Sequence, residues 1–519
     1  MSQTSPLSIA EHYHQRTKYD PETIAQKSQG LNWEEQPVPF KDYKIGGEID
    51  LKPYLQGDRT DVQWQKLSAF LLCSYGITAR VPTLMGDPFY LRAAPSAGGL
   101  YPAEVYLISR GTSLLNAGLY NYQSRTHSLV QFWENPVWEA LQTACFQHPT
   151  LEQTSLAIAI TAVFFRSAWR YQDRAYRRIC LDTGHLLGNL ELAGARSGYY
   201  PRLIGGFDDD RTNELLYLDP QQEGTLAILP LMETGAAQQP ASKAPSALAS
   251  ERQTDYPQLA DGELLQYLHQ ATRISAEDPP LSQGEPELES DDKYNFPFCL
   301  KVATQSRPID FGDRPDSGNW LSAIERGSVS SLENTMLKRR STRSYTGADL
   351  SLDELRALLD FTYHPHHYPN QGLDSDPDYF DLSLLQTFIA VSGVTGLEEG
   401  CYYYAPRAQE LRQIRFKNFR RELHYLCLGQ DLGRDAAAVI FHTVDLRQAV
   451  GKYGDRVYRY LHMDAGHLGQ RLNLAAIHLG LGVSGIGGFF DDRVNEVLGI
   501  PLDEAVIYIT TLGRPRTTG

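Results

Sequence analysis

The sequence predicts an α+β protein made of two fused copies of one domain, related by a pseudo-twofold axis. Residues 171–216 match residues 453–498 at an offset of 282 without a gap, with 23 identities in 46 positions. The same offset aligns Gly118–Tyr122 with Gly400–Tyr404. In each copy, helices with apolar positions at helical spacing alternate with apolar strands. Because the period is far too long for a solenoid, we expect a covalent pseudo-dimer in which each copy is a mixed or antiparallel sheet wrapped by helices.

Composition limits the classes of function. The chain has 519 residues, 42% hydrophobic and 21% charged, which is typical of a globular protein with two to four domains. A formal net charge of −15 argues against a general nucleic-acid binder. The apolar run Leu156–Phe165 is only about half as long as the ~20 residues of a membrane helix, and the N-terminus lacks the apolar core of a secretory signal. The six cysteines show no metal-ligand or redox spacing, so we expect reduced thiols in a cytoplasmic protein.

A change in composition separates the two copies. Residues 234–250 are rich in Ala, Ser, Pro and Gln, which predicts a flexible linker. We therefore expect copy one at residues 1–233, a linker and extension with one short helix at residues 234–330, and copy two at residues 331–519.

The elements should follow the same order in both copies: a first helix, two apolar strands, a long central helix and a final strand. Leu352, Leu355, Leu358 and Leu359 lie at helical spacing, and the Gly–His pairs at His185 and His467 predict close helix packing with a structural hydrogen bond in each copy. The expected helices are Gln63–Ser74, Tyr176–Arg196, Ser351–Tyr363 and Tyr458–Leu479, and the expected strands are Ala103–Ser109, Leu156–Phe164, Thr225–Leu231, Leu384–Val391, Ala437–Val444 and Glu504–Leu512.

A basic motif, Lys-Arg-Arg-Ser-Thr-Arg-Ser-Tyr at residues 338–345, precedes the first helix of copy two. Its guanidinium and hydroxyl groups could hold a phosphate by charge-assisted hydrogen bonds. The candidate ligands are Arg339, Arg340, Ser341 and Arg343. From charge alone, a solvated basic turn fits this motif equally well.

A second motif, Ala-Pro-Ser-Ala-Gly-Gly-Leu-Tyr-Pro at residues 94–102, leads into a strand of copy one. Small residues let the backbone approach a planar ring closely, and exposed N–H groups there can bind ring edge atoms. An ordinary glycine-rich turn would have the same composition. The candidate residues are Pro95, Ser96, Ala97, Gly98 and Gly99.

Taken together, the two motifs resemble those of the nitroreductase-like flavoprotein superfamily. Arg-Arg-Ser-x-Arg opening a helix resembles its FMN-phosphate motif, and Pro-Ser-Ala-Gly-Gly-Leu-Tyr-Pro closely resembles the flavin-contacting loop of its SagB/ThcOx-type dehydrogenases. The resemblance implies two nitroreductase-like domains with FMN at their interface. It also implies an oxidoreductase that passes a hydride from a substrate C–H to flavin N5. Members of that branch oxidise azolines in peptides, so the implied substrate is a peptide or a small molecule.

Further segments fit the same resemblance. The loop Gly485, Ile486, Gly487 and Gly488 resembles the one beneath the isoalloxazine ring. Arg514 and Arg516 follow the final strand, as does the basic residue that returns to the phosphate in the superfamily. Residues 13–19 resemble the leader segment of the branch. Gln430 resembles an amide that binds the flavin pyrimidine edge, although a surface glutamine is an almost equally good interpretation.

Each copy lacks what the other retains. In copy one, the stretch Leu51–Asp61 carries no Arg-Arg-Ser-x-Arg. In copy two, the counterpart of the small-residue loop is Pro-Asp-Tyr-Phe-Asp at Pro377–Asp381. If phosphate and loop contacts come from different copies, one site is complete. The other should pair Leu51–Asp61 with Pro377–Asp381 and be blocked by the carboxylates of Asp378 and Asp381.

The catalytic residues would be a basic residue and a tyrosine before the central helix: Lys452 with Tyr453, or Arg170 with Tyr171. A cation could lower the tyrosine pKa and make it a general base, whereas helix-end packing and salt bridging explain both pairs equally well. Tyr171 would serve the complete site, but arginine at position 170 is a poor proton carrier and puts azoline oxidation in doubt.

Two alternative functions remain open on the sequence alone. One is an NAD(P)H-dependent nitro or quinone reductase, and the other is a flavin-free scaffold that docks peptides. No metal site is expected, since the histidines at residues 364–367 are better explained by a solvated loop. The internal twofold partner would allow the chain to be a monomer, with no membrane or nucleic-acid partner.

Overall fold

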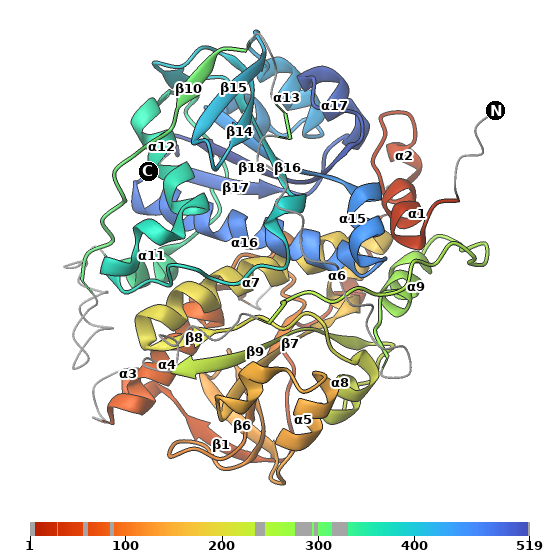
Figure 1. Ribbon diagram of the computed structural model, residues 1–519, viewed down its shortest axis with the longest axis vertical. Coiled ribbons are helices and arrows are strands. Elements are labelled where there is room, and N and C mark those ends of the chain that lie inside the picture. The colour runs from red at the N-terminus through yellow and green to blue at the C-terminus, as the bar shows by residue number, and fades with distance from the viewer. Residues whose placement is uncertain are drawn as a thin grey trace.

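Two similar lobes meet along a pair of long central helices (Figure 1). The computed structural model describes residues 6–27, 30–55, 61–83, 88–233, 244–275, 293–294, 299–313 and 331–516. The central helices are α7 (Ala175–Ser197) and α16 (Val457–His478), one from each copy. Both lie within two residues of the expected helix ends.

Each lobe contains a seven-stranded sheet whose neighbouring strands are antiparallel. The strand orders are β1-β6-β5-β4-β7-β9-β8 and β10-β15-β14-β12-β16-β18-β17. These orders correspond strand for strand, which confirms the duplication and the α+β fold. The strands of copy one are β1 (Gly47–Asp50), β4 (Ala103–Ser109), β5 (Gly118–Gln123), β6 (Ser128–Trp133), β7 (Leu156–Val163), β8 (Tyr199–Pro201) and β9 (Glu223–Glu233). Those of copy two are β10 (Lys301–Ala303), β12 (Gln386–Val391), β14 (Gly400–Ala405), β15 (Glu410–Arg415), β16 (Ala438–Asp445), β17 (Gly482–Ile486) and β18 (Glu504–Gly513).

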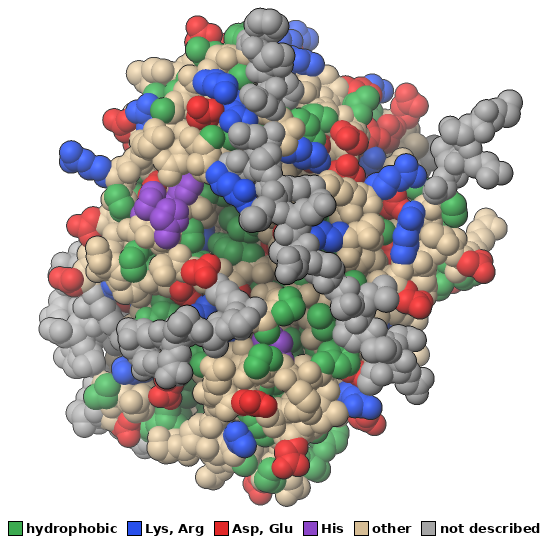
Figure 2. All heavy atoms as spheres, in the orientation of Figure 1, with side chains coloured by type: hydrophobic (Ala, Val, Ile, Leu, Met, Phe, Trp, Pro, Cys, Tyr) green, Lys and Arg blue, Asp and Glu red, His purple; other side chains and the backbone are tan. Residues whose placement is uncertain are grey.

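Further helices and short strands surround the sheets. The helices are α1 (Ile9–Arg16), α2 (Ile24–Lys27), α3 (Lys52–Leu55), α4 (Val62–Tyr75), α5 (Trp138–Ala144), α6 (Phe164–Tyr171), α8 (Asp209–Leu215), α9 (Leu264–Ala271), α11 (Leu332–Lys338), α12 (Leu352–Tyr363), α13 (Arg420–Leu426), α14 (Asp431–Asp435), α15 (Leu446–Tyr453) and α17 (Asp491–Leu498). The short strands are β2 (Ile77–Val81), β3 (Phe89–Arg92), β11 (Leu350–Ser351) and β13 (Val394–Thr395). None of these described helices is long and apolar enough to cross a membrane. Acidic and basic side chains are interspersed over the face shown in Figure 2.

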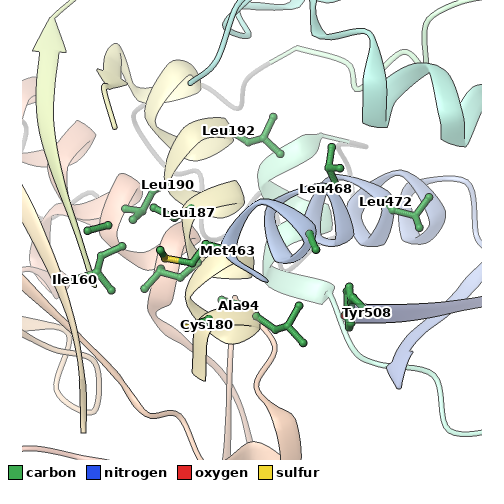
Figure 3. Packing of buried hydrophobic residues seen from close by; sticks show 14 of the residues in the cluster. Ala94, Ile160, Cys180, Leu187, Leu190, Leu192, Met463, Leu468, Leu472 and Tyr508 are labelled. Atoms are coloured by element: carbon green, nitrogen blue, oxygen red, sulfur yellow. The ribbon is translucent and has the colours of Figure 1, made fainter. Parts of the chain in front are cut away.

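The central helices touch at glycines, as their small residues predict. A Cβ atom on Gly184 would lie 2.1 Å from the carbonyl oxygen of Met463, and one on Gly466 would lie 2.3 Å from that of Leu181. Apolar side chains of both helices continue into one core (Figure 3). The two histidines are buried there: His185 contacts the Tyr508 hydroxyl at 2.7 Å, while His467 contacts Glu191 at 3.2 Å.

Parts of the expected linker and extension belong to the folded core. Strand β10 is the edge strand of the second sheet, so the second sheet begins before residue 331. Residues 244–250 are packed against the protein: Gly205 N donates to Ser246 O at 2.7 Å, and Ser250 N donates to Tyr453 O at 3.0 Å. The expectation of a flexible linker therefore does not hold for its described part, because its backbone is hydrogen-bonded to both copies. Residues 234–243 lie outside the described residues.

Buried ion pairs fasten the two copies to each other. Asp491 of copy two accepts from Arg174 at 2.9 Å and from Arg177 at 2.7 Å. The pseudo-twofold counterpart is Asp209 of copy one, which binds Arg456 and, at 2.7 Å, Arg459. These acids, at the starts of α8 and α17, neutralise arginines of the other copy, because an unpaired buried guanidinium is costly.

The segments around α1 and α9 occupy equivalent places beside these ion pairs. Arg177 donates to the hydroxyl of Thr17 at 3.0 Å, after α1. Arg459 donates to the hydroxyl of Thr272 at 2.8 Å, after α9. The leader-like segment is thus duplicated as well, although its second copy lies within the range expected to be linker and extension.

Candidate functional site

Arg339 of copy two reaches the backbone of copy one directly before the small-residue loop. Its Nε donates to the carbonyl oxygen of Ala93 at 2.6 Å, and its Nη2 donates to that of Arg92 at 3.1 Å. The side chain is buried, and its Nη1 has no hydrogen-bond partner among the described residues. Burial lowers the pKa of Arg339 to about 10, so the group stays charged at neutral pH. The phosphate motif and the loop therefore meet across the interface.

The rest of the basic motif is extended and follows helix α11. The expectation that it opens a helix is wrong, since eight residues separate Arg343 from α12. Arg340 donates to the hydroxyl and carbonyl oxygens of Thr78 in copy one, at 3.0 and 2.8 Å. Ser341 is half-buried and Arg343 is exposed.

The backbone of the C-terminal arginines, Arg514 and Arg516, is hydrogen-bonded to the segment that contains the basic motif. Arg516 N donates to Ser344 O at 3.0 Å, and Thr346 N donates to Arg514 O at 2.9 Å. The Arg514 side chain is paired with Glu354 at 2.7 Å. Both arginines therefore lie beside the basic segment, but Arg514 already has a carboxylate partner.

The small-residue loop is held by a carboxylate of the central helix. Asp182 accepts from the hydroxyl of Ser96 at 2.6 Å and from the backbone N–H of Ala97 at 3.1 Å. Burial raises the pKa of Asp182 to about 7. Gly98 and Gly99 have φ values of +66° and +67°, the left-handed region that favours glycine.

Tyr171 lies directly against this loop. A Cβ atom on Gly98 would be 2.8 Å from the Tyr171 hydroxyl oxygen and 3.3 Å from Cδ of Arg170. Burial raises the pKa of Tyr171, although Arg178 and Arg170 oppose this shift. The expected lowered pKa is therefore wrong, because loss of hydration outweighs the two cations. Tyr171 is protonated at neutral pH.

The second glycine loop approaches the same place from copy two. A Cβ atom on Gly487 would lie 2.1 Å from Nη1 of Arg178, a residue of copy one. Gly485 is packed just as closely: a Cβ atom on it would lie 2.2 Å from the hydroxyl oxygen of Tyr508. Ile486 ends β17 and is buried. Gln430 is exposed and donates to Cys427 O at 2.9 Å.

A cavity of about 900 Å³ opens beside Tyr171, Arg178 and Gly488, whereas the basic motif and the loop at residues 95–99 are not part of its lining. Both copies line it, together with the segment that follows α1. Its lining includes Arg16, Thr17, Tyr19, Phe165, Trp169, Arg170, Tyr171, Arg174 and Arg178 from copy one, and Leu428 and Gly488 from copy two.

Comparison with known proteins identifies the family. The pattern described as "Nitroreductase family" matches residues 60–231 and 336–514, which is more than half of the chain. The chain belongs to the nitroreductase family. This is a family of flavin oxidoreductases, and the double match confirms that the nitroreductase domain is duplicated within one chain.

Individual relatives cover the chain to different extents. A crystal structure of a provisionally named nitroreductase from Anabaena variabilis is 66% identical, with a TM-score of 0.90, and covers 98% of this chain and 100% of its own. A provisionally named nitroreductase of Methanocaldococcus jannaschii is 33% identical over 169 residues, or 33% of this chain and 84% of the relative. The microcin B17-processing protein McbC of Escherichia coli is 25% identical over 147 residues, or 26% of this chain and 52% of the relative.

The interface of this nitroreductase-family chain fits FMN, the cofactor that the family implies. Nη1 of Arg339 is a buried donor with no hydrogen-bond partner among the described residues, as a phosphate ligand would require. At Gly98 and Gly487 a Cβ atom would collide with Tyr171 and Arg178, so both loops require glycine where they pack against these side chains. The unpaired Arg339 donor thus suits an anionic group such as the FMN phosphate.

The pseudo-twofold-related pocket is filled. Gly205 is the counterpart of Gly487. A Cβ atom on Gly205 would lie 2.2 Å from the ring of Phe380. That ring stacks on Tyr460 with centroids 4.5 Å apart. Gly206, the counterpart of Gly488, faces Leu248 of the connecting segment, 2.2 Å from its Cγ.

The carboxylates expected to block this pocket have partners. Asp381 accepts from Lys452 at 2.8 Å and from the Tyr453 hydroxyl at 2.9 Å. Asp378 accepts from Leu203 N at 3.0 Å. The expected electrostatic block is therefore wrong, because neighbouring cations and donors neutralise the acids. Apolar and aromatic side chains fill the space instead.

The expected partner of these acids, the stretch Leu51–Asp61, is described only at its ends. Leu51 N donates to His127 O at 3.1 Å and Asp61 caps α4, while residues 56–60 lie outside the described residues. Between the edge strand and the first long helix, copy one has 11 residues where copy two has 48. The shorter connection accompanies the absence of Arg-Arg-Ser-x-Arg from copy one.

Sequence reasoning missed Arg178. The repeat places Tyr460 opposite it, in a stretch where Asp173, Arg174 and Arg177 all match their counterparts. The exchange of Arg178 for a tyrosine in the second copy was the feature of the sequence that pointed to it. It could not be interpreted before the cavity was known.

Proposed function

We propose that the chain is an FMN-dependent oxidoreductase with one cofactor site, formed jointly by both copies. The observation that carries this proposal is the contact of Arg339 with the backbone before the small-residue loop, with Nη1 of the same guanidinium left unpaired. Phosphate and ring contacts would then come from different copies. In the other half, Phe380 and Leu248 occupy the equivalent space and the arginine motif is missing.

The residues that would hold the phosphate are Arg339, Arg340, Ser341 and Arg343. Arg514 and Arg516 lie beside them. The loops at residues 95–99 and 485–488 would border the ring, with Gln430 near the second loop. When bound, FMN supplies two-electron redox chemistry by exchanging a hydride at N5 with a substrate. The chain's own contribution is to position the substrate, exclude water and hold a proton on Tyr171.

The purified chain tests this proposal directly. It should be yellow, and heat should release about one FMN per chain, quantified by absorbance against protein. A ratio near two would mean that both pockets bind and would contradict the single-site assignment. A colourless protein that takes up no FMN would favour the flavin-free scaffold and contradict the proposal.

For the reaction, we propose a SagB/ThcOx-type dehydrogenase that oxidises an azoline of a peptide or a similar C–H group. The loop sequence at residues 95–102 and the partial similarity to McbC support this substrate class. The azoline would lose a hydride and a proton, and Arg170 with Tyr171 is the pair at the open cavity. Lys452 with Tyr453 is bound to Asp381 in the filled pocket, so it supports no reaction there.

One observation favours a second candidate, an NAD(P)H-dependent nitro or quinone reductase. Tyr171 keeps its proton at neutral pH and has arginine beside it, which suits a proton donor better than a base. Oxidation of NADH or NADPH with a quinone or nitroarene present, followed at 340 nm, tests this reaction. Formation of an azole from an azoline peptide, followed by a mass loss of two hydrogens, tests the first.

A further inference from the structure

Arg178 is a buried cation with no ion pair among the described residues; the nearby carboxylate of Asp182 attracts it electrostatically but is hydrogen-bonded to Ser96 and Ala97. Arg178 is 6% exposed, and its Nε has no hydrogen-bond partner in the described part of the chain. Among the described residues, no carboxylate lies within ion-pair distance of it, and its guanidinium lies 3.9 Å from the centre of the Tyr171 ring. Charged side chains are rarely buried without a partner, because loss of hydration is costly. A buried guanidinium that lines a cavity therefore indicates an anion supplied from outside the chain.

The other half of the molecule has no such charge. The counterpart of Arg178 is Tyr460, which stacks on Phe380 in the filled pocket and donates to the carbonyl oxygen of Gly205 at 3.1 Å. The cation is therefore present only where the cavity is open. A purely structural role in the helix pair would not require this difference.

Arg170 supplies a second unpaired guanidinium to the same cavity. It lies 5.8 Å from the centre of the Tyr171 ring and has no ion pair or hydrogen bond among the described residues. By contrast, the other two lining arginines are already neutralised: Arg16 by Asp261 at 2.6 Å, and Arg174 by Asp491.

The other acidic residues of the lining do not neutralise Arg170 and Arg178. Asp173 accepts backbone hydrogen bonds from Gly262 at 2.6 Å and from Leu265 at 3.1 Å. Glu35 is exposed. Around Tyr171, the cavity thus keeps two guanidinium groups that have no ion pair among the described residues.

Aromatic side chains border this charge. Trp169 lines the cavity, and its ring packs against Trp33 with centroids 5.5 Å apart. Trp33 is 61% exposed and Phe165, another lining residue, is 54% exposed. Exposed aromatic groups beside a cavity favour contact with an apolar ligand surface.

We propose that Arg170 and Arg178 form an oxyanion receptor for the substrate, which binds a carboxylate or phosphate group while the Trp33–Trp169 pair contacts its apolar part. This inference rests on the proposed function only in taking the cavity as the substrate site. It assigns the substrate a class, an organic anion with an apolar or aromatic body. Guanidinium groups suit both carboxylate and phosphate, since they can donate two parallel hydrogen bonds.

Isothermal titration calorimetry on the purified full chain tests the receptor with three probes of similar size: benzoate, phenyl phosphate and uncharged benzamide. At least one anion should bind measurably more tightly than benzamide. Tighter binding of benzoate identifies a carboxylate substrate, whereas tighter binding of phenyl phosphate identifies a phosphate-bearing one. Equal binding of all three probes would overturn the proposal.

Single variants locate the charge. Arg178→Gln should weaken binding of the anion about ten- to a hundredfold, since it removes buried charge-assisted hydrogen bonds. Arg170→Gln should weaken it about two- to fivefold, because water screens an exposed cation. Arg16→Gln is the matched control: it removes a cation from the same cavity whose charge Asp261 already neutralises, and should change the affinity less than about twofold. Unchanged affinity in Arg178→Gln would overturn the proposal.

FMN content, measured on every sample, separates this proposal from the proposed function. If Arg178→Gln loses FMN while the parent chain retains it, Arg178 serves the cofactor and the receptor is wrong. If the parent chain holds no FMN, the proposed function fails while calorimetry still decides the receptor. Arg178→Lys keeps the charge and should retain more anion binding than Arg178→Gln, which excludes misfolding as the cause of a loss.

Discussion

In one interface pocket, a small-residue loop leaves Tyr171 beside a cavity of about 900 Å³. In the pseudo-twofold-related pocket, Phe380 and Leu248 fill the corresponding space. The surrounding scaffold is the same in both halves, from the strand order to the Arg–Asp pairs at Asp209 and Asp491. The comparison shows that the two copies share the strand order and the ion pairs that join them, whereas the side chains in the two pockets differ.

Two equivalent carboxylates hold the loops of the two pockets, although the loops themselves differ in sequence. Asp182 binds the loop of the open pocket through Ser96 and Ala97, and Asp464 binds the loop of the filled pocket through the N–H groups of Phe380 and Asp381, at 3.0 and 2.9 Å. The anchor is retained while the residues it anchors differ completely. Selection on the interface and selection on the ligand are therefore separable in this chain.

The largest expected effect is loss of cofactor from the open pocket alone. Arg339→Ala removes charge-assisted hydrogen bonds worth about 1.5–3 kcal/mol, or about ten- to a hundredfold in FMN affinity. Arg202→Ala, which removes a cation paired with Asp374 near the filled pocket, should leave FMN content unchanged. Flavin fluorescence after denaturation measures both. Full FMN retention in Arg339→Ala would remove the main support for the phosphate assignment.

Emptying the filled pocket should not create a second site. The double variant Phe380→Ala with Leu248→Ala should lower the free energy of unfolding by about 5 kcal/mol, chiefly through the cavity left by the aromatic ring. The FMN ratio should stay near one per chain, because copy one has no arginine motif to bind a second phosphate. Urea unfolding and flavin content are the two measurements. A ratio that rises toward two would show that filling alone keeps the pocket closed.

Breaking either buried ion-pair cluster should destabilise the chain similarly. Asp209→Asn and Asp491→Asn each leave two arginines without a counter-charge, so each should lower the free energy of unfolding by about 3–5 kcal/mol. Asp491→Asn should also tighten binding of an anionic probe, since it leaves the guanidinium of Arg174, which lines the cavity, without its counter-charge, whereas Asp209→Asn should not. Urea titration and probe calorimetry give the two numbers. Equal binding in both variants would contradict a link between this cluster and the open cavity.

The smallest expected effect is on the pH dependence of stability, and it should be equal in the two halves. Burial raises the pKa of both Asp182 and Asp464 to about 7, against about 3.9 in an unfolded chain. Between these values the folded protein binds more protons than the unfolded one. Each group therefore makes stability fall as pH rises from about 4 to about 7.

Asp182→Asn and Asp464→Asn should each flatten that slope by a similar amount, measured as urea midpoints from pH 4.5 to 8. A change in only one variant would mean that the two carboxylates no longer play the same part. Asp182 and Asp464 would then be equivalent in position but not in their effect on stability.

Much of the fold followed from local sequence. The apolar runs at residues 103–109 and 156–163 form β4 and β7 almost at their expected ends, and the glycines of the central helices mark the crossing. These features depend on residues close in sequence. The edge strand β10 could not be predicted in the same way, since its three residues gain their partner only from β15.

The candidate site was predictable where it consists of motifs. Arg339 and the loop at residues 95–99 were both expected, and they meet across the interface. The tyrosine pKa was not predictable, because its direction depends on how deeply the ring is buried. The block of the second pocket was expected from the charges of Asp378 and Asp381, but their partners Leu203, Lys452 and Tyr453 are brought to them only by the fold.

The sequence by itself determined the duplication, the family and the unequal distribution of binding motifs, because identity at a fixed offset and short motifs are properties of the linear chain. Only the tertiary structure decided which charges are compensated. Arg174 directly precedes α7, Arg178 lies in its first turn, and both line the cavity, yet among the described residues only Arg174 has an ion pair, with Asp491 of the other copy. Burial and long-range pairing set the cost of a charge, and both arise only when distant segments pack together.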